Sequence, residues 1–177
     1  ALYYNTVSLH DGNHPPGSTA RTSGEESYSR LLTKLFSDFD KFIELLTASG
    51  RPAVVVMVPE HGDALRGDKM QISGLREIPS PAITQIPVGI KLVGLKGAAG
   101  VTRQIEAPVS FLAMSKFLSN LTATNPFAAA QVNLDDYLRD LPQTEAVSEN
   151  AGTVILRHGG RYYMKSPDGS WSEYKPG

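Results

Sequence analysis

The sequence predicts an α/β domain that ends in a small antiparallel meander. Residues 1–7 and the run 54–58 each have the apolar, β-branched or aromatic content of a strand, and an amphipathic helix lies between them. A strand, a helix and a second strand indicate a βαβ unit with a right-handed crossover. The run 54–58 is therefore expected to lie in a parallel sheet, buried on both faces. A domain that opens directly on a strand is also expected to be the tail of a longer polypeptide.

Composition narrows the class of protein. The chain has 177 residues, which suits one domain with a sizeable core, and its net charge of −1 argues against a nucleic-acid-binding surface. No apolar run is long enough to cross a bilayer. Cysteine is absent, which excludes disulfides and thiolate sites within these residues.

The elements between the ends follow from periodicity and capping. Ser23 and Glu26 fit a capping box, so a helix is predicted to run to about Ser49, before Gly50 and Pro52. Residues 62–85 read as a long loop, and long loops in compact domains are often functional. The rest of residues 1–150 is predicted to form a strand over 86–93 and a loop over 94–100. A helix over 108–121 follows, with its apolar residues inward, and then a short helix from Asn133 to Leu141.

The tail, residues 151–177, has a different pattern. Short strands are predicted at 153–157, 161–165 and 171–174, joined by turns at Gly159-Gly160 and at residues 167–169. The aromatic residues of this tail either stack on sugar rings or pack the meander against its domain, and packing is the commoner use. They are Tyr162, Tyr163, Trp171 and Tyr174.

Potential metal ligands follow the run 54–58. Glu60 and His61 come just after Pro59, where open α/β sheets place their sites, and a carboxylate with an imidazole suits Zn²⁺ or Mn²⁺. Asp63 is a possible acceptor that orients the imidazole. Two ligands are too few for a zinc site built from protein, which usually has three or four. A polar strand end without a metal therefore stays an alternative.

Other polar residues also invite a functional interpretation. His14 lies in the loop 10–18 and can donate to a phosphate oxygen or a leaving group, or simply bond locally. Arg66, Lys69 and Arg76, in the long loop after His61, can bind a phosphoryl group or form a solvated surface.

Residues 59–68 resemble the metal-binding loop of the alkaline phosphatase and sulfatase superfamily, which usually reads Asp-His-Gly after a buried strand. Here Glu60 stands in place of the aspartate. Together with residues 69–81, the loop resembles one branch, the cellulose phosphoethanolamine transferases encoded with bacterial cellulose synthase. The resemblance covers the whole chain.

This resemblance implies the C-terminal part of an alkaline-phosphatase-like three-layer sandwich. It implies that Glu60 and His61 bind Zn²⁺, that His14 approaches the transferred phosphoryl group, and that Arg76 contacts substrate. The serine nucleophile and the remaining ligands would lie upstream, so the chain alone would be inactive.

The implied reaction moves phosphoethanolamine from phosphatidylethanolamine to cellulose hydroxyls of the biofilm matrix. The implied partners are the upstream part of the same polypeptide and the cellulose synthase complex, at the periplasmic face of the bacterial inner membrane. A phosphodiesterase or sulfatase of the same superfamily, with water as acceptor, stays an alternative. So does a non-enzymatic glycan-binding module that uses the aromatic tail.

Overall fold

The computed structural model describes residues 1–10, 14–19, 21–67, 69–96, 101–145 and 147–176. Its elements are α1 (Gly24–Ala48), β1 (Ala53–Met57), α2 (Pro81–Thr84), β2 (Gly89–Val93), α3 (Phe111–Ala123), α4 (Leu134–Tyr137), β3 (Val147–Asn150), β4 (Thr153–His158), β5 (Arg161–Lys165) and β6 (Trp171–Tyr174). Helices and strands are mixed, as in part of an α/β domain. The sheets that the described residues form are antiparallel.

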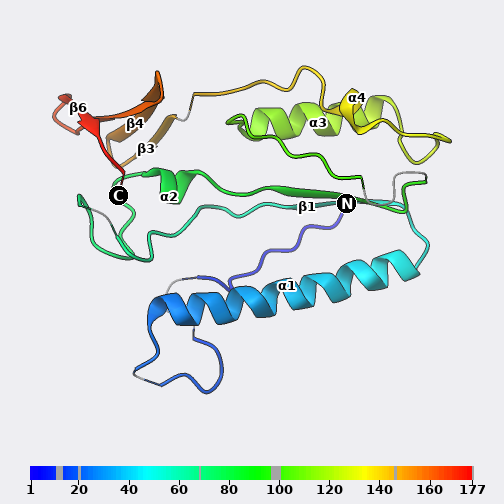
Figure 1. Ribbon diagram of the computed structural model, residues 1–177, viewed down its shortest axis with the longest axis horizontal. Coiled ribbons are helices and arrows are strands. Elements are labelled where there is room, and N and C mark those ends of the chain that lie inside the picture. The colour runs from blue at the N-terminus through cyan, green and yellow to red at the C-terminus, as the bar shows by residue number, and fades with distance from the viewer. Residues whose placement is uncertain (11–13, 20, 68, 97–100, 146, 177) are drawn as a thin grey trace.

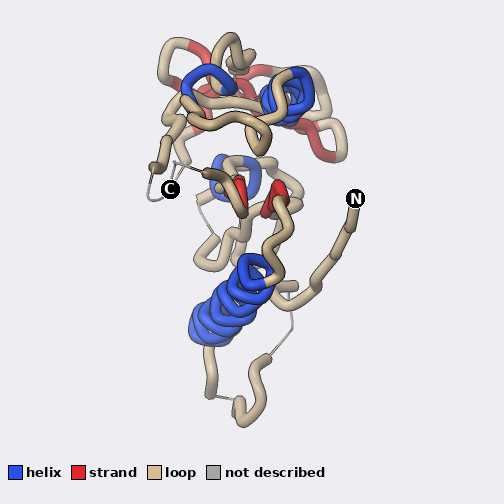
Figure 2. Tube along the Cα trace, turned by 90° about the vertical axis from the view of Figure 1, so that its right-hand side faces the viewer, coloured by secondary structure: helices blue, strands red, loops and turns tan. Residues whose placement is uncertain are grey.

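The elements lie in layers around the β1–β2 pair. Figures 1 and 2 both show α1 on one side of this pair, with α3 and α4 on the other. The meander of β3 to β6 lies beside the α3 layer, near the end of the molecule that holds α2 and the start of α1 (Figure 1). Segments that are distant in sequence therefore meet at this end.

Helix α1 forms as the sequence predicts. The Ser23 hydroxyl caps it by accepting the Glu26 N–H at 3.1 Å, and Gly50 follows its end with a φ of +66°, a conformation that suits glycine. Its apolar stripe is half-buried, and Phe42 is still 43% exposed. The bounds of this helix therefore follow from its capping residues and not from burial of its apolar side chains.

The predicted parallel sheet is wrong. β1 pairs antiparallel with β2, in a register that places Ala53 opposite Val93 and Met57 opposite Gly89. An apolar run predicts a strand but not the direction of its neighbour, and the long connection over 58–88 lets the chain return the opposite way. β1 is not buried on both faces either, since Val54 is 37% exposed. β2 begins after Pro87, which has no N–H to donate to a ladder.

The predicted strand over residues 1–7 is also wrong. These residues have no regular structure, and Leu2, Tyr3 and Tyr4 are each more than 80% exposed. Strand-like composition gives a strand only where a neighbouring backbone pairs with it, and no described strand does so here. The proposed βαβ crossover is absent from the described residues for the same reason.

The α3–α4 layer packs on β2. Phe117, Leu121 and Tyr137 are buried and contact Ile90 and Leu92 of β2. The helix was expected to begin at Pro108, but Ser110 caps it, and its hydroxyl accepts the Leu112 N–H. The first turn does not face inward as predicted: Phe111 is 58% and Leu112 71% exposed.

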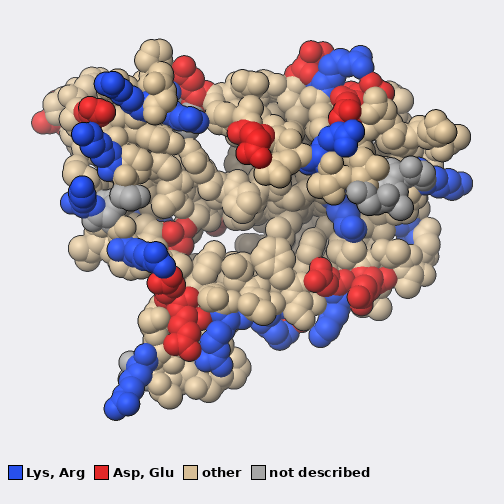
Figure 3. All heavy atoms as spheres, in the orientation of Figure 1, with Lys and Arg blue, Asp and Glu red and all other residues tan. Residues whose placement is uncertain are grey.

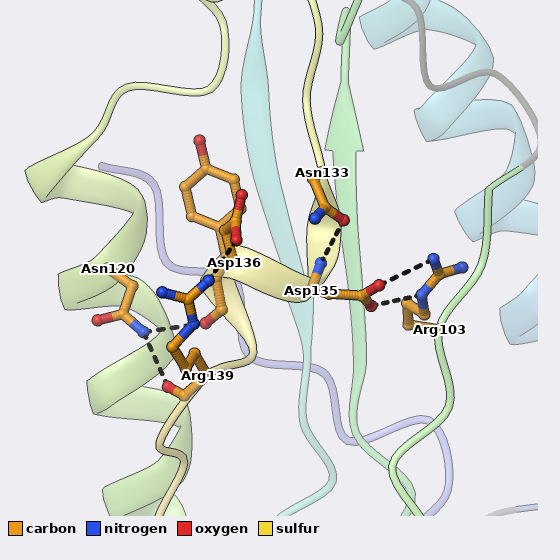
Figure 4. A network of polar contacts seen from close by, with 7 residues as sticks. Arg103, Asn120, Asn133, Asp135, Asp136 and Arg139 are labelled. Atoms are coloured by element: carbon orange, nitrogen blue, oxygen red, sulfur yellow. Dashed lines mark hydrogen bonds and ion pairs between the residues drawn. The ribbon is translucent and has the colours of Figure 1, made fainter.

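Helix α4 is held by polar contacts on both sides (Figure 4). Asn133 caps it by accepting the Asp135 N–H, Arg103 pairs with the Asp135 carboxylate, and the Asn120 amide of α3 donates to the Tyr137 carbonyl at 3.0 Å. The helix ends at Tyr137, short of the predicted Leu141. Asp140, with a φ of +57°, has a left-handed conformation that an α-helix excludes.

The C-terminal meander is confirmed and extended. The strands pair in the order β3-β4-β5-β6, and Gly159 and Gly160, with φ of +56° and +77°, form the predicted turn. β3 escaped prediction because Ser148, Glu149 and Asn150 have little strand propensity. It forms by pairing with β4 across a two-residue turn.

Two predicted loops are only partly described: residues 11–13 of the loop 10–18 and residues 97–100 of the loop 94–100 lie outside the described ranges. On the face drawn in Figure 3, acidic and basic side chains are interspersed among the described residues, without a continuous basic stripe. In the part of the chain that the structure describes, no helix has the length and apolarity needed to cross a membrane.

Candidate functional site

Glu60 and His61 lie just beyond the carboxyl end of β1, where the sequence places them. The chain leaves β1 at Met57 and bends at Glu60, and both polar side chains are exposed. The bend supplies the turn that adjacent strand residues need if their side chains are to approach one point.

Gly62 sets the position of this bend. Its N–H donates to the Ile83 carbonyl at 2.7 Å, which joins the bend to α2. A Cβ on Gly62 would lie 2.0 Å from the Ala82 carbonyl oxygen, well inside van der Waals contact. Only glycine therefore allows the backbone after His61 to lie this close to α2.

The His61 imidazole is held at both nitrogens. Its Nδ1 lies 2.7 Å from the Gly62 carbonyl oxygen and donates to it, while Arg76 Nη1 donates to Nε2 at 2.5 Å. These contacts require a neutral ring with its proton on Nδ1. Arg76 occupies Nε2, the nitrogen that would face a metal, so an ion would bind there only with the guanidinium moved aside. The predicted orienting acceptor, Asp63, is replaced by the backbone carbonyl of Gly62.

Arg76 is therefore the predicted site residue that the fold brings to His61. Its own backbone carbonyl accepts a hydrogen bond from Asn150 Nδ2, at the end of β3, at 2.6 Å. The contact between Arg76 and His61 places a guanidinium beside an imidazole, an arrangement able to bind an anionic group.

His14 lies apart from these residues in its hydrogen bonding. Its Nδ1 is 3.0 Å from the hydroxyl of Ser27, a buried residue in the first turn of α1, and it shares no hydrogen bond with Glu60, His61 or Arg76. The start of α1 nevertheless borders the loop that follows His61. A shallow depression between them is lined by Ser23, Gly24, Glu25, Asp63, Leu65, Ser73, Gly74 and Leu75.

An ion pair joins the same two segments. Arg66 donates to both oxygens of Glu25, at 2.5 Å through Nη2 and at 3.3 Å through Nε. This hydrogen-bonded guanidinium lowers the pKa of the Glu25 carboxyl, and the carboxylate raises the pKa of Arg66. Arg66 thus links the loop to α1, which favours a structural role over phosphoryl binding.

Replacing Arg66 with glutamine should raise the pKa of Glu25 back to its ordinary value. Because the pKa of Glu25 is lower in the folded protein than in the unfolded chain, the pair stabilises the fold fully at pH values above the unfolded-state pKa. This stabilisation is lost as the pH falls through the folded-state pKa. Titration of the Glu25 carboxyl carbon by NMR measures the change, with Arg30→Gln on α1 as the control. An unchanged Glu25 pKa in Arg66→Gln would contradict this pairing.

The donor set for a metal is partial. Glu60 makes no hydrogen bond to a described residue, and the described residues contain no group of three or more His, Cys, Asp or Glu side chains that could hold an ion. The neutral His61 ring and the adjacent carboxylate fit Zn²⁺ by type. A complete centre would need ligands from other segments.

Two of the four aromatic residues of the tail, Tyr162 and Tyr174, serve packing. Tyr174 is buried with Ile155 and Met164, and the Tyr162 hydroxyl accepts a hydrogen bond from Gln85 at 2.8 Å. Trp171, by contrast, is 54% exposed. The commoner use of these residues, docking the meander on its domain, is therefore the one seen for Tyr162 and Tyr174.

The described chain thus forms part of an α/β domain with an imidazole–guanidinium pair beyond the end of a strand. Residues 1–171 match the family model of the cellulose biosynthesis protein BcsG C-terminal domain. The cellulose biosynthesis proteins BcsG of Salmonella typhimurium strain LT2 and of Escherichia coli strain K12 are each 43% identical to this chain over 175 residues. The matches cover 98% of this chain and 31% of each relative. The chain belongs to the BcsG family and corresponds to its C-terminal domain.

Proposed function

We propose that this chain is the C-terminal part of a zinc-dependent phosphoethanolamine transferase that acts in cellulose biosynthesis. The observation that carries the proposal is the contact between Arg76 and the neutral ring of His61, just beyond β1. The names of the family and of the relatives point to cellulose biosynthesis, and the resemblance to the phosphoethanolamine transferases supplies the reaction.

Glu60 and His61 would hold the zinc ion, which when bound would supply positive charge for phosphoryl oxygens and for an attacking hydroxyl. The Gly62 carbonyl keeps the His61 proton on Nδ1, which leaves Nε2 as the metal-binding nitrogen, and the Arg76 guanidinium that now contacts Nε2 would move aside for the ion. Arg76, beside His61, would bind a phosphoryl oxygen through its guanidinium fork. His14, fixed by Ser27, would donate a proton to the leaving oxygen.

The remaining parts of the reaction lie beyond this chain. The proposed donor is phosphatidylethanolamine, the acceptor is a hydroxyl of cellulose, and the nucleophilic serine lies in the upstream part of the same polypeptide. We place the complete protein at the periplasmic face of the inner membrane, beside the cellulose synthase complex.

The test is zinc binding by the complete protein. In His61→Ala, zinc affinity should fall by at least about a hundredfold, since one of few ligands is lost, and transfer of phosphoethanolamine to cellulose should fall with it. His158→Ala is the matched control, because His158 is an exposed residue at the end of β4, with its Nδ1 3.5 Å from Glu145 Oε1. Zinc content by metal analysis and labelled cellulose by mass spectrometry are the measurements.

Two results would overturn the proposal. One is full transfer by the His61→Ala protein. The other is release of free ethanolamine phosphate as the sole product when cellulose is present, which would identify a hydrolase.

A further inference from the structure

The meander binds one particular stretch of the candidate site. We name residues 76–85, which run from Arg76 through α2, the strap. Asn150 donates to the Arg76 carbonyl at 2.6 Å, the Ser148 hydroxyl donates to the Pro79 carbonyl at 3.0 Å, and Gln85 donates to the Tyr162 hydroxyl. The meander thus holds the strap at its beginning, its middle and its end.

Apolar and polar contacts then fix the strap near Arg76. Ile78 packs on the buried cluster of the meander. From the other side, the buried Gln71 side chain donates to the Ile78 carbonyl at 2.9 Å and accepts the Ile78 N–H at 3.1 Å. The backbone two residues after Arg76 is therefore held by hydrogen bonds on one side and by packing on the other, and the Arg76 carbonyl accepts from Asn150.

Asn150 lies next to the tight turn that joins β3 to β4. It is the last residue of β3 and pairs with Thr153 across a turn in which Ala151 and Gly152 have φ of +48° and +82°. Positive φ at both central positions is the geometry of tight hairpin turns. The turn thus places the Asn150 backbone at the end of β3, from where its amide reaches the Arg76 carbonyl.

We propose that Asn150 is a positioning residue: by holding the Arg76 carbonyl, it keeps the Arg76 guanidinium next to His61. This inference rests on the proposed function for its catalytic consequence. It needs the side-chain amide, because an N–H must face a carbonyl oxygen, and an aspartate of the same shape would present oxygen to oxygen. Ser148 forms a similar bond from the same strand, but to Pro79, and so provides a matched control.

The first measurement needs no activity. Carbethoxylation of His61 by diethyl pyrocarbonate, quantified by peptide mass spectrometry on the complete, chelator-treated protein, reports how well Arg76 shields Nε2. The rate should rise several-fold in Arg76→Ala and approach that value in Asn150→Ala and Asn150→Asp. In Ser148→Ala it should stay at the native rate. A native rate in Asn150→Ala would overturn the proposal.

The second measurement is a double-mutant cycle on phosphoethanolamine transfer. Asn150→Ala should lower kcat/KM about ten- to a hundredfold, as expected when a catalytic group is displaced by about an ångström. In the Arg76→Ala background the same change should add little, because Asn150 acts through Arg76. Additive losses in the cycle would contradict the positioning role, because a general loss of folded protein would also be additive.

The two measurements separate this inference from the proposed function. If the native protein transfers no phosphoethanolamine but the carbethoxylation pattern is as expected, Asn150 positions Arg76 and the proposed reaction is wrong. If transfer occurs and Asn150→Ala changes neither measurement, the reaction stands and the positioning role is wrong.

Discussion

Gly62→Ala should destabilise the domain by more than about 3 kcal/mol. The added Cβ would lie 2.0 Å from the Ala82 carbonyl oxygen and 3.1 Å from its carbon, so backbone rather than a flexible side chain must move. That movement also breaks the 2.7 Å bond from the Gly62 N–H to the Ile83 carbonyl. Because the Gly62 carbonyl holds His61, the ring should lose its orientation as well.

Chemical denaturation of the two proteins measures this effect. Gly24→Ala is the matched control, since a Cβ at Gly24 meets nothing within 4 Å and alanine favours a helix. Its stability should equal or slightly exceed that of the native protein. A Gly62→Ala protein with the native denaturation midpoint would show that the bend is not packed against α2 in solution.

Ile155→Ala should cost about 2–5 kcal/mol, the range for truncating a buried branched side chain. Ile155 is 2% exposed and packs with Met164 and Tyr174, the cluster that also holds Ile78 of the strap. The cavity would therefore weaken both the meander and its attachment to the segment that carries Arg76.

Ile155→Val provides the graded comparison, with an expected loss of about 0.5–1.5 kcal/mol. Hydrogen exchange should show faster exchange across the strap in Ile155→Ala than in Ile155→Val, since only the larger cavity frees Ile78. Equal exchange in the strap of both variants would mean that the meander does not hold it.

Capping and turn residues in the sequence predicted the helices and turns whose geometry is set by neighbouring residues. The N-cap at Ser23, the stop at Gly50 and the paired glycines 159–160 each fix backbone geometry within a few residues. The helix α1 and the three predicted strands of the meander formed as expected for this reason. The position of Glu60 and His61 after β1 followed from the same kind of evidence.

The errors concern partners that are distant in sequence. The direction of β2 relative to β1 depends on a long connection, and residues 1–7 lack a strand to pair with. No pattern in the sequence pointed to Asn150 as a residue of the site, because its contact with Arg76 forms only when the meander packs on the rest of the chain. The use of a backbone carbonyl rather than Asp63 to orient His61 also depends on the exact path of the bend.

The bond between Asn150 and Arg76 also has a consequence for the order of events during synthesis. Asn150 lies 74 positions after Arg76, so at rates of about 5–20 residues per second it is synthesised about 4–15 seconds later. Hairpins such as β4–β5 form within about 1–10 microseconds once made. Arg76 therefore leaves the ribosome long before its anchor exists, and the site should be among the last parts of a nascent chain to take its final form.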